Sequence, residues 1–266
     1  MNRLELEIAW RYLRSRRGSR LLSLISVIAI GGVVVGVSAL VLIMGVMNGL
    51  QRDLREKILI GSPDVRVLSY GDMRIDGWRP LLETVRGRPD VVAAAPFVLA
   101  EGMVRQLGRT YVEGIYISGI PAAEGAEPQV TSVRDWTVSG DFTFVDSDGS
   151  RRGIVLGRTL AAKLDVQVGD TIEIGTLGNT SVNAVTGTAI PNFNIVQREV
   201  TGTFETGMYE YDNKYAYVAL EEAQALAGLG DAVTGLEVRA SNRDVATAVA
   251  TDVAAAVGYP YRAVDW

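Results

Sequence analysis

Residues Leu21–Met47, LLSLISVIAIGGVVVGVSALVLIMGVM, contain no charged residue, and the nearest charges are Arg20 and Arg52. At the helical rise of about 1.5 Å per residue this run spans about 40 Å, whereas the hydrocarbon core of a bilayer is about 30 Å thick. A buried helix of a soluble domain needs only one apolar face, so the run predicts a transmembrane helix. Its length allows it to cross with tilt or to emerge from the membrane still helical.

A cleavable signal peptide is the rival interpretation of this N-terminus, because Val37-Ser38-Ala39 resembles a cleavage site. The apolar part of a signal peptide is about 7–15 residues long. Here the apolar run continues past that site to Met47, which favours a retained span.

Charge is distributed unevenly along the chain. Residues 1–50 carry six Arg against Glu5 and Glu7, a net charge of +4. The remaining residues carry −9, which gives −5 for the whole chain. Basic residues concentrated before the span predict a cytoplasmic N-terminus, with residues from about 51 outside. The acidic remainder argues against a nucleic-acid partner, because phosphate binding relies on clustered Lys and Arg.

Three regions are expected: a juxtamembrane segment at 1–20, the membrane helix at 21–60 and an outer domain at 61–266. Leu4, Ile8 and Tyr12 recur at a spacing of four, which predicts an amphipathic helix at the inner interface. A simple basic anchor fits this segment equally well. Small residues on one face of the membrane helix predict close packing against a second helix. These residues are Gly32, Gly36, Gly45 and Gly49.

Beyond Pro63, short strand patterns alternate with short helical patterns, which predicts an α+β fold with a mixed outer domain. Strands are expected at 64–69, 91–106, 110–120, 194–204, 215–220 and 233–239, helices at 78–86, 132–136, 221–227 and 242–257, and a strand–helix–turn–strand unit at 153–176. Gly61-Ser62-Pro63 is expected to end the membrane helix.

The stretch Leu177–Ile195 is long and almost free of charge, and its Val and Thr residues flank Gly187 and Pro191. This composition predicts a projecting β-hairpin. Its tip, Ile190-Pro191-Asn192-Phe193, would expose apolar groups unless it touched another molecule. We therefore favour a tip that binds a partner over a covered loop.

No residue pattern for catalysis is visible. The chain has no His and no Cys, which removes the usual metal ligand, the usual general base and thiolate chemistry. No phosphate-binding G-x-x-x-x-G-K-[ST] motif occurs. Asp146 with Asp148, Gly169-Asp170, and Asp212 suit solvated or capped turns. We expect no catalytic residue, metal ion or cofactor.

Several short motifs follow one another in order along nearly the whole chain. Around the span these are Ala9-Trp10-Arg11-Tyr12-Leu13-Arg14 and Val46-Met47-Asn48-Gly49 with Leu54 and Ile58-Leu59. In the outer domain they are Ile154-Val155-Leu156-Gly157, Leu160-Ala161, Leu164, Val168-Gly169-Asp170, Gly202-Thr203-Phe204, Gly207–Asp212, Val233-Thr234-Gly235 and Asp265-Trp266. Together they resemble the motifs of the lipoprotein-releasing ABC permeases LolC and LolE.

Two single residues and one larger feature depart from that family. Leu50 stands where Phe is common, and Asp64 stands where His is common. The family also has three more membrane helices after its periplasmic domain, for which this sequence shows no second apolar run. The resemblance therefore implies an N-terminal portion of a permease.

The resemblance implies a MacB-like periplasmic domain with Porter and Sabre subdomains. It implies a non-catalytic permease subunit of the bacterial inner membrane, with a second permease subunit and a LolD-like ATPase as partners. Such transporters pass lipoproteins from the outer leaflet to the periplasmic carrier LolA. In LolC a projecting hairpin, the hook, captures the carrier, and its tip aligns with Gly187, Ile190, Pro191, Asn192 and Phe193. The lipoprotein cavity corresponds to Met44, Met47 and Leu50, where flexible Met side chains suit varied acyl chains. Met side chains that simply face the lipid bilayer fit these positions equally well.

Three alternatives stay open. A MacB-like or FtsX-like permease for efflux or signalling shares the same architecture. A single-span anchored periplasmic binding or scaffold protein, complete at 266 residues, also fits. An enzyme is disfavoured, although distant carboxylates brought together by the fold would escape sequence analysis.

Overall fold

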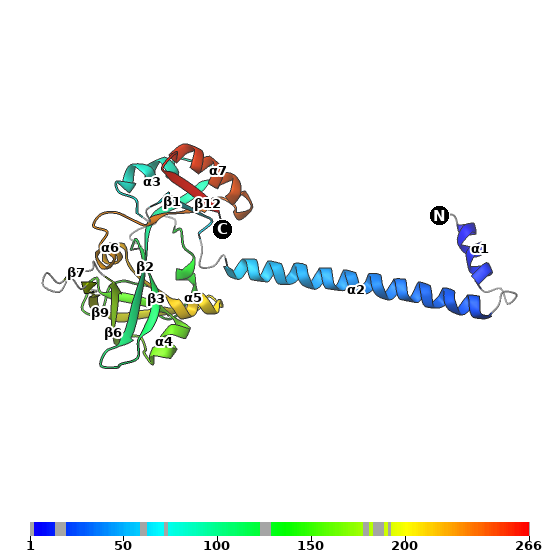
Figure 1. The fold of residues 1–266 in the computed structure, drawn as a ribbon, viewed down its shortest axis with the longest axis horizontal. Helices are drawn as coiled ribbons and strands as arrows, with labels where there is room; N and C mark the ends of the chain where they lie inside the picture. The colour runs from blue at the N-terminus through cyan, green and yellow to red at the C-terminus, as the bar shows by residue number, and fades with distance from the viewer. Residues whose placement is uncertain are drawn as a thin grey trace. The chain divides into compact units, whose positions relative to one another are not determined.

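The computed structural model describes residues 3–13, 20–58, 63–71, 74–122, 129–177, 181–182, 189–190 and 193–265. The chain divides into two compact units, Met1–Arg55 and Glu56–Trp266. The first unit contains the helix α1 (Arg3–Leu13) and most of α2 (Arg20–Ile58), the blue helices of Figure 1. Within the described part of the chain, Leu24–Gln51 is the one helix segment long and apolar enough to cross a membrane, and none of it is buried.

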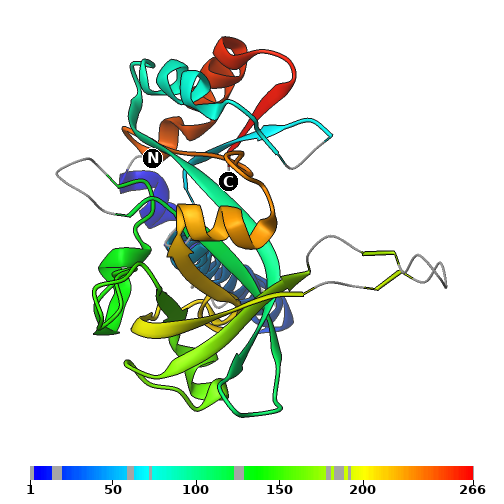
Figure 2. The same cartoon turned by 90° about the vertical axis from the view of Figure 1, so that its left-hand side faces the viewer.

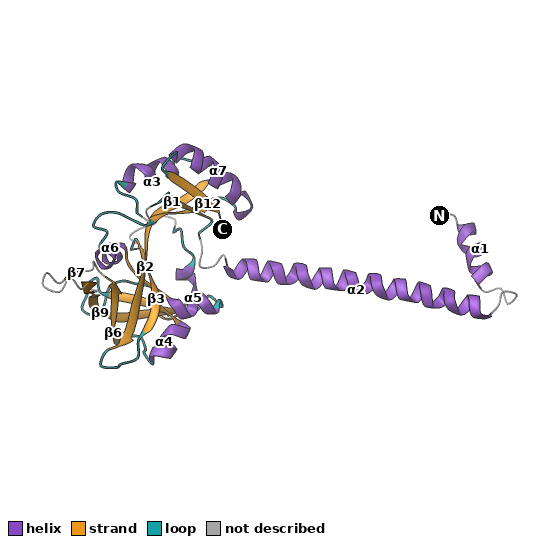
Figure 3. Cartoon of the chain, in the orientation of Figure 1, coloured by secondary structure: helices purple, strands orange, loops and turns teal. Residues whose placement is uncertain are grey.

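The second unit is a mixed α/β domain (Figure 3). Its strands are β1 (Val65–Ser69), β2 (Val91–Gln106), β3 (Glu113–Ile120), β4 (Thr137–Gly140), β5 (Gly153–Gly157), β6 (Thr171–Leu177), β7 (Ser181–Val182), β8 (Ala189–Ile190), β9 (Phe193–Phe204), β10 (Tyr215–Ala219), β11 (Gly235–Ala240) and β12 (Tyr261–Asp265). Its α-helices are α3 (Trp78–Arg86), α4 (Arg158–Leu164), α5 (Tyr209–Lys214), α6 (Leu220–Ala227) and α7 (Ala246–Val257), with short 3-10 turns at Val133–Trp136 and Arg243–Val245.

Strand β2 is long enough to belong to two parts of the sheet. Its first half pairs with β11, from Val91 opposite Ala240 to Phe97 opposite Gly235, and β11, β1 and β12 follow in antiparallel order. We call this part the open half. Helices α3 and α7 pack against it and against each other (Figure 1).

The second half of β2 enters a closed ring of six strands. Around the ring, β2 pairs with β3, β3 with β10, β10 with β5, β5 with β9, β9 with β6, and β6 again with β2. The β3–β10 and β5–β9 pairs are parallel, and the others are antiparallel. Closure leaves these six strands without a free edge between them. The short strand β4 continues the sheet beyond β9.

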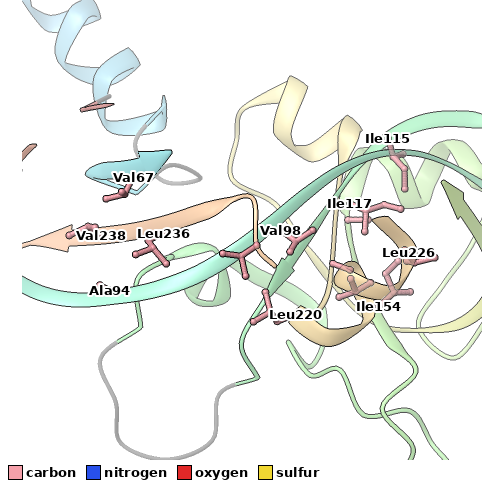
Figure 4. Packing of buried hydrophobic residues seen from close by; sticks show 14 of the residues in the cluster. Val67, Ala94, Val98, Ile115, Ile117, Ile154, Leu220, Leu226, Leu236 and Val238 are labelled. Atoms are coloured by element: carbon pink, nitrogen blue, oxygen red, sulfur yellow. The ribbon is translucent and has the colours of Figure 1, made fainter. Parts of the chain in front are cut away.

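The main apolar core runs through both parts of the sheet (Figure 4). Val67 and Leu236 come from the open half, Ile117 and Ile154 from the ring, and Val98 from the strand that they share, and all five are completely buried. Each such side chain contributes about 1.5–3 kcal/mol by leaving water.

Two glycines allow close approach of helices to this sheet. A Cβ added at Gly119 of β3 would lie 2.2 Å from the Cβ of Ala223 in α6, and one at Gly157 would lie 2.2 Å from the carbonyl oxygen of Asp212 in α5. Carbon atoms in contact are normally about 3.5–4.0 Å apart. Glycine at 119 is therefore what brings α6 directly onto β3.

The element pattern read from the sequence is largely confirmed, with three differences. Residues 209–214 form the helix α5 where a turn was predicted, and β4 and β12 were not predicted. Both strands are short and owe their conformation to pairing with β9 and β1 rather than to a strong local pattern. The membrane helix was predicted to reach about Ile60; α2 ends at Ile58, and residues 59–62 lie outside the described part.

Candidate functional site

The hairpin predicted over 177–195 is built on the neighbouring ring strands β6 and β9. Strands β6 and β9 pair from Thr171 opposite Glu199 to Leu177 opposite Phe193. Farther along, β7 and β8 pair again, with Ser181 opposite Ile190. Figure 2 shows β6 and β9 running outward together from the rest of this unit. Strands β6 and β9 therefore form a regular antiparallel ribbon up to Leu177 and Phe193.

The base of this ribbon exposes apolar side chains. Leu177 is 64% exposed and Ile195 is 51% exposed. Next to them, Gly175 pairs with Ile195, and an added Cβ would come within 3.1 Å of the Ile195 side chain. Apolar side chains held on a rigid strand pair are typical of a surface that another protein covers.

Helix α6 holds the arms in place. The Thr176 hydroxyl donates a hydrogen bond to the Leu226 carbonyl, and the Asn194 amide donates to the Ala225 carbonyl over 3.3 Å. Both acceptors lie in the last turn of α6, where helix carbonyls have no partner within the helix. The C-terminal end of α6 thus supplies the hydrogen bonds that fix where the ribbon leaves the ring.

A cavity of about 380 Å³ lies beside these contacts. Arg198 and Glu222 form an ion pair at its wall, and Asn194 and Leu226 also line it. Burial raises the pKa of Glu222, against the opposing effect of Arg198. Oxygen Oε2 of Glu222 accepts no hydrogen bond from the part of the chain that the structure describes. The base of the hairpin therefore combines apolar surface with a polar pocket.

The predicted tip residues are only partly described. Ile190 lies in β8, and Phe193 opens β9. Gly187, Pro191 and Asn192 lie outside the described residues. The described residues of this stretch pair as β6 with β9 and β7 with β8, and the projecting hairpin and the binding role of its tip stay predictions.

The predicted membrane-facing residues all lie in α2. Met44, Met47 and Leu50 are exposed on this helix. A Cβ added at Gly32, Gly36, Gly45 or Gly49 would meet no atom within 4 Å. The three apolar residues and the four glycines are thus accessible on α2. The roles of the first in lipid contact and of the second in helix pairing stay predictions.

The carboxylates that were predicted to lie in turns accept hydrogen bonds from nearby backbone N–H groups. Asp146 Oδ1 accepts from the backbone N–H groups of Asp148 and Ser150, and Asp170 accepts from that of Gln167. Asp212 is buried in α5 and accepts from the backbone of Thr206 and Gly207. Among the residues described, no group of three or more acidic, His or Cys side chains is arranged to hold a metal ion.

Comparison with known proteins shows to which family this chain belongs. A model of the MacB-like periplasmic core domain family matches residues 26–256. The chain belongs to the MacB-like periplasmic core domain family. The chain is similar to the lipoprotein-releasing system transmembrane protein LolC of Neisseria meningitidis serogroup B, with 31% identity over 92% of this chain and 56% of that protein. It is also similar to LolE of Haemophilus influenzae, with 30% identity over 87% of this chain and 54% of that protein.

Among solved structures, the periplasmic region of MacB from Actinobacillus actinomycetemcomitans covers 77% of this chain and 90% of its own, with a TM-score of 0.43 and 11% identity. The chain spans little more than half the length of the two relatives named above. The MacB-like family match confirms the predicted fold class, and the two relatives confirm the resemblance to LolC and LolE.

Sequence analysis found the hairpin of this MacB-like domain but missed its support. Thr176, Asn194, Arg198 and Glu222 were not singled out. The only local signal was the return of charge at Arg198-Glu199 after the uncharged stretch. Their partners on α6 are 24–50 residues away in sequence, so that the fold alone brings them together.

Proposed function

We propose that this chain is the carrier-binding and membrane-inserted part of an ABC permease subunit that releases lipoproteins from a bacterial inner membrane. The observation that carries the proposal is the projecting β6–β9 hairpin, with apolar side chains at its base and its arms tied to α6. Similarity to LolC and LolE, whose names state lipoprotein release, supports this substrate class.

The hairpin would capture a LolA-like periplasmic carrier. The paired arms β6 and β9 keep the entropy cost of binding low, because their backbone is already ordered before the carrier arrives. Gly187, Ile190, Pro191, Asn192 and Phe193 would form the tip that enters the carrier. Leu177 and Ile195 at the base would widen the contact.

Helix α2 would contribute the membrane part. With the basic N-terminus in the cytoplasm, the outer domain would lie in the periplasm. Met44, Met47 and Leu50 would contact acyl chains near the outer leaflet, and Gly32, Gly36, Gly45 and Gly49 would pack against a second permease subunit.

The chain itself would carry out no chemical step. A separate LolD-like ATPase would supply the energy, and closure of the paired membrane helices would squeeze the lipids of the bound lipoprotein outward. The continuous helix α2 would transmit the movement to the periplasmic domain.

Capture of a purified LolA-type carrier by the full chain in detergent tests the proposal. Pro191→Gly and Phe193→Ala should each reduce capture at least tenfold. Tyr259→Ala is the matched control, because Tyr259 is an aromatic residue that is 91% exposed in the open half. Undiminished capture by both hairpin variants would contradict the proposal and favour a MacB-like efflux or signalling role.

A further inference from the structure

A second open surface lies between the β2–β3 strands and helix α5. It is a groove of about 670 Å³. The strands contribute Glu101, Gly114 and Tyr116, and α5 with its flanks contributes Glu210, Asn213 and Tyr215. A volume of this size accommodates a long side chain together with the backbone that carries it. None of the hairpin residues discussed above lines it.

The strand wall of the groove has an unfilled position, because Gly114 carries no side chain. Gly114 and Tyr116 share one face of β3, because Ile115 between them is buried in the core. A Cβ added at Gly114 would meet no atom within 4 Å. Glu101 stands directly opposite Tyr116 on the neighbouring strand. A carboxylate and an aromatic ring therefore flank an empty position.

Three aromatic rings, from α5, β10 and β3, meet along the groove. Tyr211 and Tyr215 stack with ring centroids 4.2 Å apart and planes 7° apart, and the ring of Tyr116 lies 5.4 Å from that of Tyr215. The three rings thus form one continuous aromatic surface. The negative faces of such rings attract cations, with about 0.5–2 kcal/mol gained per contact.

The charges around the groove favour a cation. Within the described part, Glu101 and Glu210 form no ion pair, whereas Lys214 donates to Glu113 over 2.8 Å and Lys163 lies 3.6 Å from the same carboxylate. The charged residues that line the groove are Glu101, Glu210 and Lys214, which gives a net charge of −1. The Lys214 ammonium is already held by Glu113 and by the Gly114 carbonyl, whereas the two lining carboxylates are unpaired.

A hydrogen-bond acceptor also lines the groove without a donor. Asn213 is 5% exposed, and its Oδ1 accepts no hydrogen bond from the described residues. Such an acceptor left buried costs about 1–3 kcal/mol. Because this oxygen is inaccessible to solvent, an N–H donor of a ligand would reach it only after the Asn213 side chain turns toward the groove.

We propose that this groove binds an arginine side chain carried by a segment of a partner protein. The planar guanidinium stacks on the tyrosine rings and donates two parallel hydrogen bonds to Glu101, which stands opposite Tyr116. Lysine fits less well, because its ammonium neither stacks nor forms a bidentate pair. The groove would be a second protein contact, separate from carrier capture by the hairpin.

Fluorescence anisotropy tests the proposal with the full chain in detergent and a labelled peptide, Gly-Ser-Arg-Ser-Gly. The Arg peptide should bind at least tenfold more tightly than the same peptide with Gln, and binding should weaken as salt increases. Gly114→Val, which fills the groove, and Glu101→Gln, which removes a carboxylate, should each weaken binding at least fivefold. Thr110→Val, on the exposed β2–β3 connection, should leave it unchanged.

Equal binding of the Arg and Gln peptides would overturn the proposal, as would full binding by both groove variants. Displacement of the Arg peptide by phosphatidylethanolamine vesicles, but not by phosphatidylglycerol vesicles, would assign the groove to a lipid ammonium group and would also overturn it. If Gly114→Val does not fold, Glu101→Gln alone decides between these outcomes. Carrier capture should be the same for all these variants.

Discussion

Replacing Gly119 by Ala should loosen α6 from the ring. The added Cβ would lie 2.2 Å from the Cβ of Ala223 and 3.4 Å from the Cα of Leu220, against a normal separation of about 3.5–4.0 Å. Helix α6 must therefore move by more than about 1 Å, and overpacking of this kind costs about 1–3 kcal/mol. Because the atoms that collide belong to a short side chain and to backbone, we expect the upper part of this range.

The measurement is thermal and urea unfolding of the full chain in detergent. A loss of about 2–3 kcal/mol corresponds to a fall in Tm of about 5–10 °C for a domain of this size. The matched control is Gly114→Ala on the same strand, which adds the same methyl group where no atom lies within 4 Å and should change Tm by less than about 2 °C.

The same substitution should weaken carrier capture by the hairpin, because the carbonyl groups that hold Thr176 and Asn194 move with α6. The packing argument is refuted if Gly119→Ala is as stable as Gly114→Ala. The argument that α6 supports the hairpin is refuted if the protein is destabilised but captures the carrier with unchanged affinity.

Four further outcomes are expected. Lys214 and Tyr111 lower the pKa of Glu113 to about 2, so its contribution of about 1 kcal/mol is complete above its ordinary pKa and is lost as pH falls through about 2. Glu113→Gln should therefore lower the urea midpoint at pH 7 and lower it clearly less at pH 2.5. Thr176→Val should cost about 1 kcal/mol and increase amide hydrogen exchange in β6, and unchanged exchange there would contradict the tether to α6. Gly36→Ile should reduce crosslinking of α2 to a second membrane helix at least threefold, whereas an equal yield would exclude this face. Because the chain has no Cys, Tyr259→Cys provides a single label site, which an impermeant maleimide should reach from the periplasmic side only; labelling from the cytoplasm alone would reverse the proposed orientation.

Local patterns predicted those elements whose residues act mainly with their neighbours. The charge-free run became α2, and the spacing of Trp78, Leu82 and Val85 produced a helix that buries these three side chains. Alternation in 91–120 produced β2 and β3. The hairpin followed from an absence of charge, which needs no knowledge of the rest of the fold.

Features that depend on distant residues were not accessible to the same reasoning. Strand β12 forms only because β1 is beside it, with Val65 opposite Asp265. The groove joins Glu101 to Tyr215, more than one hundred positions apart. In each case the local sequence is compatible with several conformations, and tertiary contact selects one. The hairpin-supporting residues that the sequence did not reveal depend on distant partners in the same way. They are Thr176, Asn194, Arg198 and Glu222.

The double membership of β2 has a consequence for anyone who wishes to divide this protein. A break near Val98 would leave each fragment with an incomplete sheet, so neither piece should persist alone in solution. A break or an inserted reporter at Gly108 would interrupt only the exposed connection between β2 and β3. Complementation assays and tagged versions are therefore best engineered at Gly108, where the polypeptide tolerates interruption and both strands keep their neighbours.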